Sequence, residues 1–158
     1  MIDVRRYGAE DRLWARTLLT ERWGEPRIVS RGRLVHADGL PGFVAWEDAD
    51  RCGLITYQVQ RGACELVTLD STLPGFGVGT RLVDAVRAEA ERTDCGLIWV
   101  TTTNDNLEAL RFYQRRGFVL RALHRNALDE ARKLKPSLPR VGKDGIPLRD
   151  EIELEIVL

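Results

Sequence analysis

The chain has 158 residues, of which 44% are hydrophobic, so it is long enough to form one domain with a buried core. Its 24 basic and 24 acidic side chains cancel, which argues against a dedicated nucleic-acid-binding or membrane-surface protein. No apolar run is long enough for a membrane span, and the first residues lack the apolar core and cleavage site of a signal peptide. We therefore expect a cytoplasmic protein.

The cysteines and histidines are too few and too scattered for a structural zinc site. Cys52, Cys64 and Cys95 are odd in number, no two of them form a Cys-x-x-Cys pair, and the chain has only two histidines. We therefore expect no metal site. We interpret the thiols as reduced side chains packed in or near the core, with a catalytic cysteine as the alternative.

The first half of the chain predicts strands and one helix. Residues 2–7 alternate weakly, as a first strand would, and residues 10–23 carry apolar side chains at helical spacing before Gly24-Glu25-Pro26 ends the helix. Residues 27–40 have mixed polarity, consistent with a short strand and a mobile segment, and receive no firm assignment. Three more strands joined by short turns predict an antiparallel meander, at 43–47, 52–60 and 64–69.

The second half alternates helices with strands. Apolar residues four apart from Val78 to Ala90 predict a helix that packs by one stripe, and residues 97–102 predict a strand covered on both faces. Asp105 and Glu108 fit a capping box for a helix that starts at Asn106 and ends at Gly117. The remaining segments are a strand at 118–124, a stretch compatible with a short helix at 126–135, a loop at 136–147 and a last strand at 151–156.

Residues 66–83 combine a strand, a glycine-rich turn and the start of a helix. Glycines at 75, 77 and 79 let the backbone approach a ligand closely, and the N–H groups and dipole of a helix N-terminus favour an anion. We interpret this stretch as a pyrophosphate-binding loop. A Rossmann fingerprint would need glycine where Thr80 stands, and Thr80-Arg81-Leu82 does not match a Walker A loop. A plain glycine-rich turn is the alternative.

A second motif follows the strand at 97–102. Residues 104–118 read Asn-Asp-Asn-Leu-Glu-Ala-Leu-Arg-Phe-Tyr-Gln-Arg-Arg-Gly-Phe. At this spacing after the glycine turn, the motif resembles the GCN5-related N-acetyltransferase (GNAT) superfamily. The resemblance runs from the first strand to the last, with residues 66–118 carrying it. It implies a single domain, 1–158, of the α/β class, with a mixed, mostly antiparallel central sheet of six to seven strands flanked by helices.

The resemblance also implies acetyl-CoA as the cofactor, with its pyrophosphate bound by backbone N–H groups of the turn. Gly77 and Gly79 match the glycines of the superfamily's Arg/Gln-x-x-Gly-x-Gly/Ala turn. Pro74 replaces its Arg or Gln, and Arg81 is a candidate for the missing positive charge. The strand before the turn is implied to hold the pantetheine arm. The implied cofactor-binding residues are Val67, Leu69, Gly75, Phe76, Gly77, Val78, Gly79, Thr80, Asn106 and Tyr113.

Two residues are implied to be catalytic. Tyr113 matches the tyrosine that commonly protonates the departing CoA thiolate, which has a basicity similar to that of a phenolate. Glu65 occupies the place of a carboxylate that recurs as the base. Each of the two has a structural alternative. Tyr113 could only pack its ring in the core, and Glu65 could be a solvent-facing residue of its strand. For the cofactor-binding candidate Asn106, the alternative is a residue at a helix end that binds no ligand. Asp70 is more consistent with a turn former, and His124 with a structural histidine than with a base or an acceptor ligand.

The resemblance thus implies an acyltransferase that moves an acetyl group from acetyl-CoA to a primary amine by direct attack. The expected acceptor is a small-molecule or protein amine. We expect neither nucleic acid nor a membrane as a partner, and the sequence leaves open whether the protein forms a homodimer. A non-catalytic acyl-CoA-binding or regulatory module on the same fold is the alternative, and a nucleotide-binding domain is a third reading. Residues 121–143 carry seven basic and two acidic side chains, compatible with an anionic acceptor or partner or with a solvated loop.

Overall fold

The computed structural model covers residues 1–158, which group into two units along the chain. The first unit comprises Met1–Ile28, His36–Ile98 and Leu158, and the second comprises Val29–Val35 and Trp99–Val157. The single acetyltransferase domain expected for residues 1–158 stays a prediction. None of the helices is long and apolar enough to cross a membrane.

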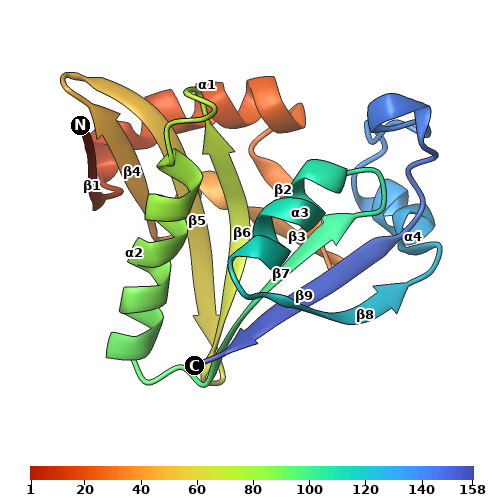
Figure 1. Ribbon diagram of the computed structural model, residues 1–158. Helices are drawn as coiled ribbons and strands as arrows, with labels where there is room; N and C mark the ends of the chain where they lie inside the picture. The colour runs from red at the N-terminus through yellow and green to blue at the C-terminus, as the bar shows by residue number, and fades with distance from the viewer. The chain divides into compact units, whose positions relative to one another are not determined.

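Four strands of the first unit are hydrogen-bonded in the order β1-β4-β5-β6, and each neighbouring pair is antiparallel (Figure 1). The meander expected from the short turns is therefore present as β4, β5 and β6. The elements of this unit are β1 (Ile2–Arg6), η1 (Ala9–Asp11), α1 (Arg12–Trp23), η2 (Ala37–Gly39), β4 (Gly42–Glu47), β5 (Asp50–Gln60), β6 (Ala63–Ser71) and α2 (Val78–Arg92).

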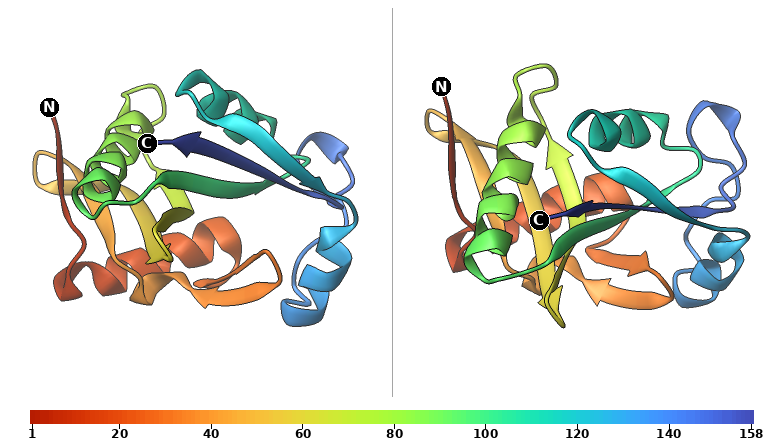
Figure 2. Two further views of the ribbon diagram at one scale, coloured as in Figure 1. Left: turned by 90° about the horizontal axis from the view of Figure 1, so that it is seen from below. Right: turned by 60° about the horizontal axis from the view of Figure 1, so that its bottom comes forward.

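Helices α1 and α2 lie on opposite sides of strands β4 and β5 (Figure 2). Leu19 of α1 is fully buried in one cluster with Val44 and Leu54 of these strands. Helix α2 packs on the other face, where it comes close to Gly53. Because helices cover both faces, β4 and β5 are buried over most of their length.

In the second unit, three strands are hydrogen-bonded in the order β7-β9-β8, with β8 and β9 antiparallel. The segment 27–40, for which the sequence predicted no definite structure, contains the hairpin β2-β3. Arg31 (φ 47°) and Gly32 (φ 75°) form its turn. The bounds are β2 (Arg27–Ser30), β3 (Arg33–His36), β7 (Leu97–Thr103), α3 (Leu107–Arg115), β8 (Val119–His124), α4 (Ala127–Leu134), η3 (Lys143–Gly145) and β9 (Glu151–Val157).

The predicted fold class is confirmed, because mostly antiparallel strands and four helices make a mixed α/β protein. One local prediction is wrong. Helix α3 has no Asp105–Glu108 capping box; its N-cap is Asn106, whose side chain accepts the N–H of Ala109. The reason is that the carboxylate of Asp105 is buried and accepts the N–H of Lys143 instead (2.9 Å).

Candidate functional site

The glycine-rich loop leaves β6 at a point fixed by hydrogen bonds from two neighbouring elements. The N–H and the hydroxyl of Thr72 both donate to the carbonyl of Cys52 on β5, at 2.9 and 3.2 Å. Arg22 of α1 donates to the carbonyl of Ser71 (3.1 Å), and the N–H of Leu73 donates to the Ser71 hydroxyl (3.1 Å). These bonds set the direction in which the loop starts toward α2.

Gly75 and Gly77 give the loop its conformation. Their φ angles are 86° and 75°, in the left-handed region that costs a residue with a Cβ about 1–2 kcal/mol. A Cβ at either position would meet no heavy atom within 4 Å, so the backbone conformation rather than crowding calls for glycine. The space beside both residues is therefore open to a ligand. Phe76 between them is 69% exposed, and Pro74 is exposed as well.

Helix α2 begins immediately after this loop, with Gly77 as its N-cap. The first bond of the helical ladder runs from the N–H of Arg81 to the carbonyl of Gly77 (3.1 Å). The N–H groups of Val78, Gly79 and Thr80 precede that bond, at the end of the helix where the dipole is positive. The first turn contains no acidic residue that would oppose an anion. This end of α2 suits a phosphate group.

Gly53 on β5 allows α2 to start this close to the sheet. A Cβ on Gly53 would lie 2.5 Å from Cγ1 of Val78, 3.1 Å from Cδ1 of Leu82 and 3.2 Å from the carbonyl oxygen of Asp70. A side chain there would push the first turn of α2 away from the strand. Sequence reasoning missed this residue. The only available signal was a glycine inside a predicted strand, which often marks a close approach of another element.

A β-bulge interrupts strand β6 at Val67. Thr68 pairs with Thr56 of β5, but the next residue of β5 pairs with Leu66, so Val67 is an extra residue with no partner across the ladder. The backbone of a bulged residue stands outside the regular hydrogen-bond pattern. Leu69, the other strand residue predicted to bind the cofactor, stays in the regular ladder.

Glu65 is only 2% exposed, so the alternative of a solvent-facing strand residue is wrong. Its Oε1 accepts a hydrogen bond from Nε2 of Gln58 on β5 (2.8 Å). Asp70 is not a turn former either, because it lies within β6. Its buried Oδ2 accepts the indole N–H of Trp23 (3.0 Å), and this bond ties the end of α1 to β6.

The three cysteines are free and buried, as the sequence predicted. Burial raises the pKa of Cys64 to about 12 and also raises the pKa of Cys52. Because the thiolate is the nucleophilic form, thiols that stay protonated at neutral pH are poor nucleophiles. Neither of these two side chains is suited to the catalytic role that was the alternative.

In the second unit, the side chain of Asn106 is part of the start of α3. Its Oδ1 accepts hydrogen bonds from the N–H of Ala109 (3.1 Å) and from Nζ of Lys143 (3.4 Å). Asp105 beside it is 6% exposed and binds the backbone N–H of Lys143. These bonds use the carbonyl oxygen of the Asn106 amide, and its NH2 group takes part in neither.

Tyr113 lies in the last turn of α3 and is 6% exposed. Its ring meets those of Phe112 and Phe118 edge-on, at centroid distances of 5.2 and 5.3 Å. The helix ends in a Schellman motif, in which Phe118 N–H donates to Tyr113 O and Gly117 N–H donates to Gln114 O. The ring is therefore held as the core-packing alternative expects, and the role in proton transfer stays a prediction.

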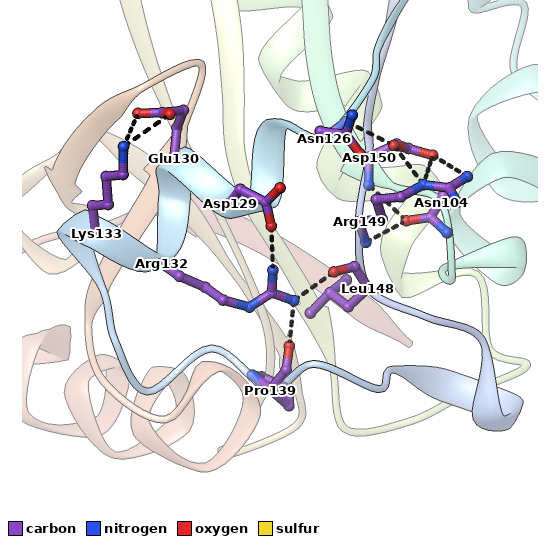
Figure 3. A network of polar contacts seen from close by, with 10 residues as sticks. All are labelled: Asn104, Asn126, Asp129, Glu130, Arg132, Lys133, Pro139, Leu148, Arg149 and Asp150. Carbon is purple, nitrogen blue, oxygen red and sulfur yellow. Dashed lines mark hydrogen bonds and ion pairs between the residues drawn. The ribbon is translucent and has the colours of Figure 1, made fainter.

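One charge of segment 121–143, on Arg132, connects separate parts of the second unit (Figure 3). Arg132 of α4 donates to the carbonyls of Pro139 (2.8 Å) and Leu148, and its Nη1 lies 3.5 Å from Oδ1 of Asp129. The guanidinium thus joins the loop after α4 to the residues before β9. Such an arginine has a structural role, so the segment is more than a solvated loop.

His124 also has a structural partner. Its Nε2 lies 2.8 Å from Oε1 of Glu153 on the neighbouring strand β9. Arg31 of the β2-β3 hairpin contacts the same carboxylate (3.2 Å) and that of Glu151 (2.6 Å). This network favours the structural reading of His124 over a role as a base.

Comparison with known proteins agrees with this geometry. Residues 9–118 match the model of the Acetyltransferase (GNAT) family. The uncharacterized protein YdhI of Bacillus subtilis (strain 168) is 39% identical over 143 residues, which cover 87% of this chain and 89% of YdhI.

Two solved structures share the fold at lower sequence identity. The IAA acetyltransferase from Bacillus cereus ATCC 14579 superposes with a TM-score of 0.78 at 18% identity, over 100% of both chains. A Bacillus subtilis acetyltransferase in complex with CoA superposes with a TM-score of 0.71 at 19% identity, over 99% of this chain and 97% of the other.

Proposed function

The chain belongs to the GNAT family of acetyltransferases, and we propose that it transfers an acetyl group from acetyl-CoA to the primary amine of an acceptor. The observation that carries this proposal is the connection from β6 to α2. Gly75 and Gly77 adopt positive φ with open space beside them, and the first turn of α2 presents N–H groups without a carboxylate. This arrangement fits a diphosphate, which backbone N–H groups bind without help from a cationic side chain. Pro74 therefore removes one side-chain contact and leaves the backbone cradle in place.

Strand β6 supplies the two groups that we propose act on the thioester carbonyl and on the attacking amine. Acetyl-CoA brings a thioester whose carbonyl carbon bonds to the amine nitrogen while the C–S bond breaks. Val67, with its backbone outside the β5-β6 ladder, is the proposed donor to the carbonyl oxygen, where negative charge develops. The attacking amine must first lose a proton. Glu65, buried and oriented by Gln58, is the proposed base.

Two roles in the second unit follow the family resemblance and are proposed residue by residue. Tyr113 gives its phenolic proton to the departing thiolate, which leaves CoA as a neutral thiol. Asn106 contacts the cofactor through its side-chain NH2 group, since its carbonyl oxygen caps α3. We also propose that residues 1–158 act as one acetyltransferase domain. The other proposed cofactor contacts are Leu69, Phe76, Val78, Gly79 and Thr80.

A transfer assay tests this function. Acetyl-CoA is incubated with the protein and a panel of amino acids, small amines and peptides with free N-termini, and the released CoA thiol and the acetylated product are both measured. We expect product with at least one class of primary amine. CoA binding without transfer to any amine would contradict the proposal and favour the non-catalytic module.

The variant Tyr113→Phe tests the proposed acid. It keeps the ring contacts with Phe112 and Phe118 and removes only the hydroxyl. Turnover should fall by roughly 10²- to 10⁴-fold, the usual contribution of a positioned acid, while CoA affinity stays the same. Equal single-turnover rates in the two proteins would remove Tyr113 from the mechanism.

A further inference from the structure

The loop between α4 and β9 folds back on itself and contacts the residues before α3. The N–H of Gly142 donates to the carbonyl of Ile146 (2.8 Å), and the N–H of Leu148 donates to the carbonyl of Arg140 (3.0 Å). An isolated β-bridge lies between these two bonds. Residues 140–148 therefore form a hairpin-like loop of defined shape, which we call the returning loop.

The side chain of Asn104 holds the end of the returning loop. Its Nδ2 donates to the carbonyl of Pro147 (2.8 Å). Its Oδ1 accepts the N–H groups of Arg149 (3.0 Å) and Asp150 (2.9 Å) (Figure 3). The amide of Asn104 thus fixes the backbone where the loop leads into β9.

Asp105, the next residue, holds the tip of the returning loop. Its Oδ2 accepts the N–H of Lys143 (2.9 Å). Gly142 lies so close that a Cβ there would be 2.1 Å from the same oxygen and 2.9 Å from Cβ of Asp105. The φ of Gly142 is −99°, so the close approach rather than the backbone conformation calls for glycine. The tip of the loop is therefore packed against Asp105 with no room for a methyl group.

This packing places the ammonium of Lys143 beside Asn106, the third residue in the row. Nζ lies 3.4 Å from Oδ1 of Asn106, which also accepts the N–H of Ala109 (3.1 Å). The ammonium forms no ion pair, so Asn106 is its one side-chain partner, and the NH2 group of Asn106 has no hydrogen-bond partner in the structure. An amide turned by 180° would set its NH2 group against two donors. The two donors at the oxygen thus decide which end of the amide is free to bind a ligand.

We infer that Lys143 is a positioning residue for the cofactor. Its ammonium, held by the returning loop, fixes the Asn106 amide so that the NH2 group donates to acetyl-CoA. The pantetheine arm of CoA suits this end of the amide, because its own amide carbonyls are hydrogen-bond acceptors. The inference rests on the proposed contact between Asn106 and the cofactor, and it adds the group that orients that contact.

The affinity of CoA for two lysine variants tests this role. Lys143→Met keeps a long side chain and removes the ammonium. Lys133→Met is the matched control, since Lys133 is an exposed lysine of the same unit and pairs with Glu130 (3.1 Å). By calorimetry, Lys143→Met should weaken CoA binding roughly two- to fivefold, the size of one exposed charged contact, while Lys133→Met binds as the wild type does. Equal affinity of Lys143→Met and the wild type would overturn the inference.

The same substitution in the Asn106→Ala background separates positioning from direct contact. Without the amide, Lys143→Met should cause no further loss of CoA affinity, although it removes the same charge in both backgrounds. Equal losses with and without the Asn106 amide would show that the ammonium acts on the cofactor itself. That result would overturn the positioning role.

This double-variant experiment is distinct from the test of the proposed function, because its readout is CoA binding and not acetyl transfer. A protein that acetylates no amine but shows the expected coupling would contradict the proposed transfer and support the role of Lys143. Transfer by a protein in which the two substitutions act additively would do the reverse. A wild type without CoA binding would overturn both.

Discussion

Replacing Gly53 with alanine would place a methyl group in space that α2 occupies. The added Cβ would lie 2.5 Å from Cγ1 of Val78, whereas carbon atoms pack best about 3.5–4.0 Å apart. The contact must therefore open by roughly 1 Å. Val78 gives way poorly, since a β-branched side chain in a helix has one strongly preferred rotamer. The carbonyl of Asp70, 3.2 Å from the same Cβ, limits movement within the sheet. Overpacking of this kind costs about 1–3 kcal/mol.

Urea unfolding measures this cost, with Gly96→Ala as the matched control. A Cβ at Gly96 meets nothing within 4 Å, and its φ is not positive, so the control should change the unfolding free energy by less than about 0.5 kcal/mol. Gly53→Ala should also weaken CoA binding, because the displaced first turn of α2 carries the proposed phosphate-binding N–H groups. A Gly53→Ala protein as stable as the control would refute the close-packing argument.

Two further predictions concern the second unit. The Arg149 side chain, together with the N–H of Asn126, holds the pKa of Asp150 below its usual value. The ionised carboxylate therefore stabilises the folded protein above its unfolded pKa of about 3.9, and this stabilisation is lost as the pH falls through the lower pKa of the folded state. Asp150→Asn should therefore be less stable than the wild type at neutral pH and approach it in strong acid. Urea titrations over pH measure this difference, and a difference independent of pH would argue against the ionised group. Asn106→Ala removes the cap on the N–H of Ala109 and should cost about 1 kcal/mol, a loss that Asn106→Asp should largely avoid; equal losses in both variants would rule out the capping role.

The parts of the fold that depend on short-range signals could be predicted from the sequence. Glycines at 75, 77 and 79 predicted a glycine-rich loop, in which Gly75 and Gly77 have positive φ, and Gly117 marked the end of α3. These conformations depend on the residue itself, so a single sequence reveals them. The burial of Glu65 could not be predicted from the sequence in the same way, because the pattern of a strand does not tell which of its faces other elements cover.

The features of the fold and site that the sequence did not predict depend on contacts between residues far apart in the chain. Asp105 has the sequence position of a helix cap, but the N–H of Lys143, 38 residues away, takes its carboxylate. Arg22 holds the start of the glycine loop through the carbonyl of Ser71, 49 residues later in the chain. Gly53 matters because α2 packs against it. No local pattern encodes such partners, since tertiary packing overrides local preference.

The affinity of CoA for two glycine variants tests most directly whether the β6-α2 loop binds the cofactor. Gly77 and Gly62 have φ angles of 75° and 74°, and a Cβ at either position would meet no heavy atom within 4 Å, so glutamate introduces the same strain and charge at both. Only Gly77 lies in the loop. By calorimetry, Gly77→Glu should lose measurable CoA binding, while Gly62→Glu binds as the wild type does. Equal affinity in all three proteins would contradict the account.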